Sequence, residues 1–263
     1  MDEKERWENY RKANSSYPQV RAIELNKIIK FVDAKQGETI LECGTGNGYL
    51  TIPLAKSVGK NGTLISYDVT KENLEYVEYL NKDLKLNIIT KEQPRNYIFS
   101  EKDNSINKIV SIATMHHYDN RDKKTGHSGK LQAMQEFSRV LKSGGKVIIG
   151  DVANNTDSQR YFDAINNPQY CYPTGHPHDF FDLNLAKKLC KLSGLKFISF
   201  KIYSTPWVFK DDKEAMDFLH TIHNAKCSAE ESFEIAKKYL KYTKLNNKVK
   251  LGWKLGYFIA EKR

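Results

Sequence analysis

The sequence lacks a long apolar run. No stretch of about 18 apolar residues occurs in the 263 residues, so the sequence predicts no membrane-spanning helix. The first twelve residues, MDEKERWENYRK, are charged and lack the apolar centre of a signal peptide. We therefore expect a cytoplasmic protein with one sizeable core, or with a core and a small cap.

Cysteine is scarce. The chain has four cysteines, at widely separated positions and without a Cys-x-x-Cys pair: Cys43, Cys171, Cys190 and Cys227. This spacing predicts reduced thiols and argues against a disulfide framework or a zinc site. His176 and His178 form a His-x-His pair, but no cysteine-rich or acidic cluster accompanies them, so we expect no metal.

Arginine-rich runs interleaved with aromatic residues are also missing, although the formal charge is +10. A basic protein can meet nucleic acid, anionic lipid or an acidic small molecule. Here the lysines are spread along the whole chain, from Lys4 to Lys262. We therefore expect no nucleic-acid partner, and the charge favours a small anionic molecule slightly.

What the sequence does contain is an alternation of short buried runs and helical patterns. Strands are predicted at 39–43, 62–68, 86–90, 108–113 and 146–151, and helices at 50–58, 71–80 and 130–142. Thr70 is the predicted cap of the second helix, and Ser143 to Gly145 the predicted turn before the last strand. Such alternation is typical of a parallel sheet covered on both faces.

The remainder is less regular. Residues 1–24 form a polar arm with aromatic anchors, residues 25–151 the regular core, and residues 152–181 an excursion rich in Asn, Tyr, Pro and His. Residues 182–263 add a helix, a strand and a final strand to the core, with a helical insertion at about 206–250. We expect the arm, the excursion and the insertion to form a lid or cap.

Three glycines follow the first predicted strand and open a helix, in ILECGTGNGYLT. Glycine permits a positive φ and a close backbone approach, and a helix N-terminus attracts anions. A dinucleotide loop would have the spacing G-x-G-x-x-G, but position 49 is Tyr. A Walker loop would end in Gly-Lys-Ser/Thr, and this loop ends in Gly-Tyr-Leu. The spacing of the glycines therefore fits neither a dinucleotide-binding loop nor a Walker loop.

The pattern Glu42-x-Gly44-x-Gly46-x-Gly48 resembles the first motif of class I S-adenosylmethionine-dependent methyltransferases. Asp68, at the end of the second strand, matches the family's ribose-binding acid. The runs SIATMHHYDN at 111–120 and SRVLKSGGKVIIGD at 138–151 resemble two further family segments. The resemblance covers about residues 25–150 well and extends weakly over 175–200.

The resemblance implies an α/β fold, with a Rossmann-like, mostly parallel seven-stranded sheet, helices on both faces and a helical or loop cap. It also implies S-adenosylmethionine as the methyl donor and S-adenosylhomocysteine as the product. Glu42 would face the amino group of the cofactor, Asp68 the ribose, Val69 the adenine face and Glu92 the adenine amine. The other implied contacts are Gly44, Thr45, Gly46, Gly48, Ser111 and Ala113.

Histidines and aromatic residues supply the remaining candidates. His117, His116 and His176 are the candidate catalytic groups, because an imidazole base would help an acceptor that loses a proton. The candidate acceptor-binding residues are Tyr10, Tyr17, Met115, Tyr172, His178 and Trp207. The strand-four end has no Asn/Asp-Pro-Pro-Tyr/Phe box and no Pro-Cys nucleophile, so we expect a small-molecule or lipid-like acceptor.

Three other functions stay open. An RNA or protein methyltransferase would use the lysine-rich surface and bind nucleic acid in a salt-dependent way. A non-catalytic binding module would keep the fold and the ligand, and a nicotinamide oxidoreductase would also place an acid at Asp68. The sequence does not identify the methylated atom, and it is compatible with a monomer or a homodimer.

Overall fold

The structure is a computed structural model that describes residues 3–94, 96–118, 129–172, 180–246 and 248–263. These residues divide into two compact units. Unit 1 comprises residues 1–26, 152–178 and 202–255, and unit 2 comprises residues 27–151, 179–201 and 256–263. The division falls inside one helix and two strands, so both units are assembled from segments that are distant in the sequence.

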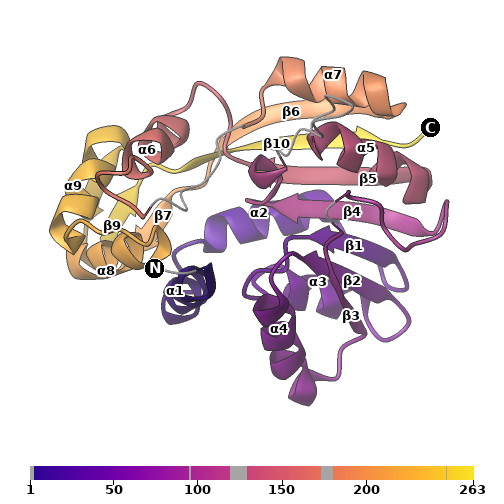
Figure 1. The fold of residues 1–263 in the computed structure, drawn as a ribbon, viewed down its shortest axis with the longest axis horizontal. Helices are drawn as coiled ribbons and strands as arrows, with labels where there is room; N and C mark the ends of the chain where they lie inside the picture. The colour runs from indigo at the N-terminus through magenta and orange to yellow at the C-terminus, as the bar shows by residue number, and fades with distance from the viewer. Residues whose placement is uncertain (1–2, 95, 119–128, 173–179, 247) are drawn as a thin grey trace. The chain divides into compact units, whose positions relative to one another are not determined.

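Unit 2 is built on a seven-stranded sheet of order β3-β2-β1-β4-β5-β10-β6 (Figure 1). Its strands are β1 Thr39–Cys43, β2 Thr63–Asp68, β3 Ile88–Glu92, β4 Ile106–Ile112, β5 Leu141–Asp151, β6 Lys196–Ser204 and β10 Lys254–Glu261. β1 to β5 pair in parallel, and β10 runs antiparallel to β5. The predicted mostly parallel, Rossmann-like sheet is confirmed.

Helices cover both faces of this sheet, because successive strand residues point to opposite sides. Leu41 and Cys43 face a core that includes Phe137 and Leu189. On the other face Ile28 lies beside Gly150, where an added Cβ would sit 3.4 Å from the Ile28 side chain. The helices are α2 Ala22–Val32, α3 Thr51–Val58, α4 Lys71–Leu84, α5 Gly129–Val140 and α7 Leu183–Ser193. Cys43 is fully buried in this core, as predicted for a packing residue.

Parallel pairing brings the carboxyl ends of the central strands to one edge of the sheet. Cys43 pairs with Tyr67 of β2 and with Ser111 of β4, and Asp68 pairs with Glu92 of β3. The loops that follow β1, β2 and β4 therefore start next to one another. In open α/β sheets this edge is where ligands bind.

Unit 1 contains four helices among its described residues and a small antiparallel sheet of order β7-β9-β8. The helices are α1 Glu3–Ser16, α6 Asp157–Ile165, α8 Asp212–Ile222 and α9 Ala229–Tyr239, and the strands are β7 Trp207–Phe209, β8 Tyr242–Leu245 and β9 Lys248–Leu251. Asp211 and Ser228 cap α8 and α9 by accepting bonds from backbone N–H groups, which stabilises each helix start. No helix among the described residues is long and apolar enough to cross a membrane.

Two local features differ from the predictions. Thr70 is the N-cap residue of α4, as predicted, but its side chain accepts no cap bond, and its own N–H donates to Asp68 Oδ1 at 2.9 Å. The predicted turn at Ser143 to Gly145 lies inside β5, where the register against β4 shifts. Main-chain bonds with Lys262 at 2.9 Å hold Gly144 and Gly145 in the sheet, so the chain bulges there and does not turn.

Candidate active site

The glycine loop after β1 has a backbone that other residues rarely adopt. Gly44, Gly46 and Gly48 have φ values of 92°, 52° and 78°. The N–H groups of Gly44 and Thr45 donate to the carbonyl of Tyr67 at 2.8 and 3.1 Å, which ties the loop to β2. A Cβ on Gly44 would lie 2.0 Å from Thr114 Oγ1, so glycine is required there by both conformation and space.

The carboxylate of Asp68 holds this loop by hydrogen bonds. Its Oδ2 accepts from Gly46 N at 2.8 Å, and its Oδ1 accepts from Thr70 N at 2.9 Å and from Asn73 Nδ2 at 3.2 Å. The side chain of Thr70 also interacts with this carboxylate, so the roughly four acceptor positions of Asp68 are largely taken within the protein. Burial raises the pKa of Asp68, and the bonds from Gly46 and Thr70 oppose that rise.

Glu42 lies fully buried beneath the loop. Ser66 Oγ donates to Glu42 Oε2 at 2.7 Å and lies 2.7 Å from Thr45 Oγ1. Burial raises the pKa of Glu42 to about 7, and the side chains of Ser66 and Thr51, which interact with the carboxylate, oppose that rise. Two further buried oxygens, Glu42 Oε1 and Asn47 Oδ1, have no hydrogen-bond partner of normal geometry among the residues that the structure describes.

These unpartnered oxygens are acceptors that a ligand with an ammonium group would satisfy. Buried polar atoms are normally hydrogen-bonded, and each exception calls for an explanation. These acceptors therefore fit the ammonium group at the amino-acid end of S-adenosylmethionine. Sequence reasoning missed Asn47 and Thr51, although Asn47 lies between Gly46 and Gly48 and Thr51 is the first residue of α3, so the glycine motif itself pointed to both.

An exposed apolar side chain lies at the adenine end of the predicted site. Val69, the residue after Asp68, is 61% exposed and offers a surface that a flat ring could cover. The side chain of Glu92 is exposed. The next residue, Gln93, is buried; its N–H donates to Asp68 O at 2.8 Å, and its Oε1 accepts from Tyr118 at 3.1 Å. Gln93 is therefore a second candidate for the role given to Glu92.

The end of β4 is constrained and contains the two histidines. Ser111 Oγ donates to Cys43 O at 3.0 Å, and Ala113 has a φ of +51°, rare for a residue with a side chain. Met115 is fully buried in the core. His116 is buried, and its ring Nδ1 lies 2.8 Å from Asp151 Oδ1. Its backbone N–H donates to Asp151 Oδ2 at 3.0 Å.

His117 has a different setting. Its ring lies 4.1 Å from the ring of His116, centroid to centroid, and its side chain is half-buried. Asp151 fixes the orientation of His116 through two bonds, so His116 has a structural task at the end of β5. Of the two histidines, His117 has the exposure that a group in contact with an acceptor needs.

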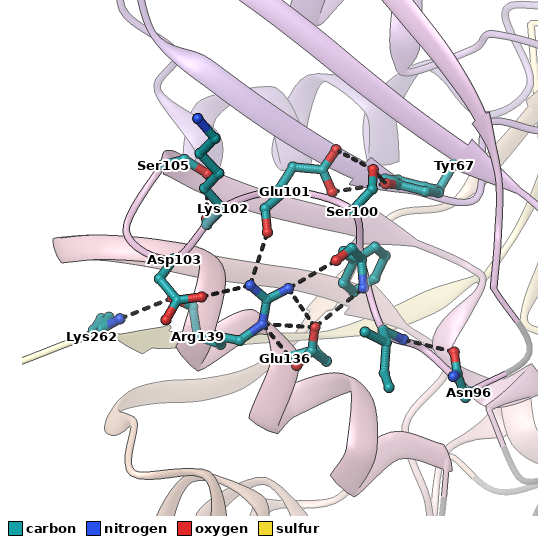
Figure 2. A network of polar contacts seen from close by, with 12 residues as sticks. Tyr67, Asn96, Ser100, Glu101, Lys102, Asp103, Ser105, Glu136, Arg139 and Lys262 are labelled. Atoms are coloured by element: carbon teal, nitrogen blue, oxygen red, sulfur yellow. Dashed lines mark hydrogen bonds and ion pairs between the residues drawn. The ribbon is translucent and has the colours of Figure 1, made fainter.

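An arginine network supports the segment between β3 and β4 (Figure 2). Arg139 of α5 donates to the carbonyls of Phe99 and Glu101, both at 2.9 Å, and pairs with Glu136 at 2.7 Å. Glu101 in turn accepts from Tyr67 Oη at 2.8 Å. The pKa of Arg139 is raised, chiefly by its bond with Glu136. The network therefore links α5 to Tyr67, whose carbonyl binds the glycine loop.

Among the described residues, four of the predicted acceptor-binding residues belong to unit 1. Tyr10 accepts from Arg21 Nη1 at 3.0 Å, Tyr17 donates to Asp217 at 3.1 Å, and Trp207 is buried against Trp253. Tyr172 is half-buried. His176 and His178 lie outside the described residues. No group of three or more potential metal ligands occurs in the described part of the chain.

Comparison with known proteins agrees with this geometry. Residues 34–173 match a family model described as a methyltransferase domain. The ubiquinone/menaquinone biosynthesis C-methyltransferase UbiE of Bdellovibrio bacteriovorus is 28% identical over 182 residues, 69% of this chain and 67% of that protein. A tRNA (adenine) methyltransferase of Methanocaldococcus jannaschii is 43% identical, but over 49 residues only, 19% of this chain and 17% of that protein.

The fold has relatives among solved structures. The YcgJ protein of Bacillus subtilis superposes with a TM-score of 0.65 at 16% identity, covering 91% of this chain and 97% of that one. The family match extends over more than half of the chain and includes the glycine loop, Asp68 and both histidines. The chain belongs to the class I S-adenosylmethionine-dependent methyltransferases.

Proposed function

We propose that the protein transfers a methyl group from S-adenosylmethionine to a small-molecule acceptor that carries an oxidisable or phenolic ring. One observation supports the cofactor site above all. Asp68 accepts from the N–H of Gly46, the exposed Val69 follows Asp68 in sequence, and Glu42, whose Oε1 lacks a partner of normal geometry, pairs with Ser66 on the strand that ends at Asp68. An acid for the ribose, an apolar surface for adenine and an acceptor for the ammonium group are thereby combined.

Two acidic residues, Glu42 and Asp68, bind different parts of the cofactor in this proposal. When bound, the cofactor supplies a positively charged sulfur and its transferable methyl group. Glu42, when ionised, attracts the ammonium group, and Asp68 accepts hydrogen bonds from the ribose. Gly46, Thr70 and Asn73 already bond to Asp68, so the ribose hydroxyls would replace one or more of these bonds, and binding requires a small rearrangement of the glycine loop or of its neighbours.

The protein's contribution to transfer is alignment. Methyl transfer is an in-line displacement, and positioning alone can supply roughly 7–11 kcal/mol of a barrier. Ser111 and Ala113 hold the end of β4, and His117 is the group we propose to contact the acceptor and take its proton. His116, bonded to Asp151, positions this turn.

The acceptor class follows from the extent of the similarities. The UbiE relative, whose name refers to quinone biosynthesis, aligns over more than two thirds of this chain, whereas the tRNA enzyme aligns over 49 residues. The lysines are scattered along the sequence. These observations favour a ring-bearing small molecule over RNA.

The test is methyl transfer from donor labelled in the methyl group, offered to three acceptors in parallel: a demethylated naphthoquinol, unmodified tRNA and a denatured protein mixture. We expect label in the solvent-extracted quinol product. Label in tRNA or protein with none in the quinol would replace the proposal by the alternative of a macromolecular acceptor.

A further inference from the structure

The last part of unit 1 is rich in lysine and free of acidic residues. Lysine is spread along the whole chain, but residues 235–255 contain seven lysines and no aspartate or glutamate, although the chain has 32 acidic residues in all. Strands β8 and β9 belong to this stretch and pair antiparallel, from Tyr242 opposite Leu251 to Leu245 opposite Lys248. The positive charge of the stretch therefore lies on a small sheet whose pairing is defined.

The two faces of this sheet differ. Val249 and Leu251 of β9 are buried, so their side of the sheet faces the interior of unit 1. Tyr242 and Lys244 lie opposite Leu251 and Val249 on β8, and both bond to Asp212 of α8, at 2.9 and 2.6 Å. An acid of α8 therefore neutralises the lysine on this inner face.

The residues that alternate with these point to the other side of the sheet, and we name them the basic face: Lys241, Thr243, Leu245, Lys248 and Lys250. All five are exposed. Lys250 lies opposite Thr243 and Lys248 opposite Leu245, and Lys241 accepts from the N–H of Gly252 at 2.9 Å through its carbonyl. Within the described part of the chain no acidic side chain forms an ion pair with any of the three lysines. The charge of the basic face is therefore not neutralised within unit 1.

Two ordinary explanations each cover only one feature of the basic face. Edge strands often contain lysine, which blocks pairing with another chain, but Lys248 and Lys250 belong to β9, the central strand of the order β7-β9-β8. Single exposed apolar residues are normal on a surface, but Leu245, at 72%, is the most exposed of the large apolar side chains that the structure describes. An aliphatic side chain at the end of a hairpin, opposite a lysine without an acid partner, fits a partner that is both anionic and partly apolar.

An anionic lipid surface has both properties, and it fits the basic face better than nucleic acid does. Proteins that bind single strands stack bases on aromatic rings, and base edges are recognised mainly by arginine, asparagine and glutamine. The basic face has none of these side chains, because the nearby Tyr242 lies on the inner face and bonds to Asp212. Lysines attract anionic headgroups, and their apolar stems lie against apolar surface while the charged ends stay in water.

We propose that the basic face is a peripheral docking surface for membranes with anionic headgroups. The three lysines lie against the headgroups, and Leu245 enters the boundary between headgroups and acyl chains. Docking of this kind is reversible and needs no helix that spans the bilayer. This inference goes beyond the proposed function and does not depend on it.

The test is co-sedimentation of the full chain with vesicles made of equal parts of phosphatidylcholine and phosphatidylserine, and with vesicles of phosphatidylcholine alone. We expect binding to the anionic vesicles only, and weaker binding as salt is added. Lys248→Gln/Lys250→Gln should weaken binding about 25-fold, because each lysine near an anionic surface contributes roughly a factor of five. Lys4→Gln/Lys12→Gln, at two exposed positions of α1 in the same unit, removes the same charge and should bind like the parent.

Leu245→Ser tests the apolar contact and should also weaken binding to the anionic vesicles. Leu192→Ser, which replaces another exposed leucine, is its control. All substituted side chains are exposed, so thermal unfolding should show every variant to be as stable as the parent. No binding to the anionic vesicles, equal binding to neutral ones, or equal affinity of all variants would overturn the inference. Binding of a labelled RNA that depends on Lys248 and Lys250, without binding to vesicles, would also overturn it and would assign the basic face to nucleic acid.

Discussion

The N–H of Gly46 donates a hydrogen bond of 2.8 Å to Oδ2 of Asp68, and this bond joins the glycine loop to the end of β2. The loop is therefore organised by the residue that is proposed to bind the ribose. A substitution of Asp68 would therefore change ligand affinity in two ways, by removing a direct contact and by altering the conformation of the loop. Substitutions within the loop itself show how much the loop conformation contributes.

Gly44→Ala tests the loop conformation. The added Cβ would meet Thr114 at 2.0 Å and would sit on a backbone with φ +92°. We expect a loss of about 2–4 kcal/mol in the free energy of unfolding, or a displaced loop that no longer binds the cofactor. Gly37→Ala is the control, because it has φ +83° but no atom within 4 Å of an added Cβ. Denaturant unfolding of the two should differ by the cost of the clash; equal losses would contradict the close approach.

The raised pKa of Glu42 predicts how the stability of the folded state changes with pH. Its pKa in the folded chain is about 7, above the usual 4.5, so the folded state holds a proton that the unfolded state releases. This contribution is complete below pH 4.5 and is lost as the pH rises through 7. Glu42→Gln should remove the loss, raising stability at pH 8 by up to about 3 kcal/mol relative to the wild type.

Thermal unfolding of both proteins between pH 5 and pH 8.5 checks this expectation. The difference in stability between Glu42→Gln and the wild type should increase as the pH rises. Cofactor binding by the wild type should show the opposite trend and strengthen as Glu42 ionises, because the bound ammonium group needs the charge. A constant gap across the range would show that Glu42 is ionised throughout.

The two histidines after β4 should behave differently. His116→Ala removes a buried ring that is bonded to Asp151, so we expect a loss of stability of about 1–3 kcal/mol. His117→Ala should leave stability within about 0.5–1 kcal/mol and lower kcat at least about 10-fold, because a positioned base is worth that much or more. Unfolding curves and methyl-transfer kinetics on the same preparations distinguish them. Full activity of His117→Ala would exclude it as the proton acceptor.

Arg139 should matter more than an ordinary surface arginine. Arg139→Met removes the bonds to the carbonyls of Phe99 and Glu101 and the pair with Glu136, which hold the segment before β4 (Figure 2). We expect a loss of about 2 kcal/mol. Arg160 forms an exposed ion pair with Asp157 on the same helix, so Arg160→Met should lower the free energy of unfolding by less than about 0.5 kcal/mol. Similar losses in the two variants would show that the network adds nothing beyond a surface ion pair.

Sequence patterns predicted unit 2 well because its strands are short, buried and bounded by glycine or polar residues. β1 was predicted with both ends as the structure has them, Thr39 to Cys43. The glycine loop and Asp68 were found because their conformations and spacing restrict the residue types that fit. Long-range contacts were not predictable in this way: the approach of Thr114 to Gly44 joins loops that are distant in sequence.

Unit 1 was less predictable. α1 is polar along most of its length, so residues 1–24 were predicted as a polar arm or lid and its helix was not identified. β8 and β9 have lysine at three of eight positions and become strands by pairing with each other and with β7. Local pattern cannot reveal such a sheet, because its strands gain their stability from neighbours. The closure of residues 1–24 over the cofactor stays a prediction, tested by the effect of deleting residues 1–20 on turnover.

The most direct measurement is calorimetric titration of the wild type and of Asp68→Ala with S-adenosylmethionine and S-adenosylhomocysteine, with NADH as the control ligand. We predict micromolar binding of both sulfur ligands by the wild type, a loss of about 10-fold to 100-fold or more in Asp68→Ala, and no binding of NADH. Wild-type protein that binds neither sulfur ligand, or that binds NADH instead, would contradict the account.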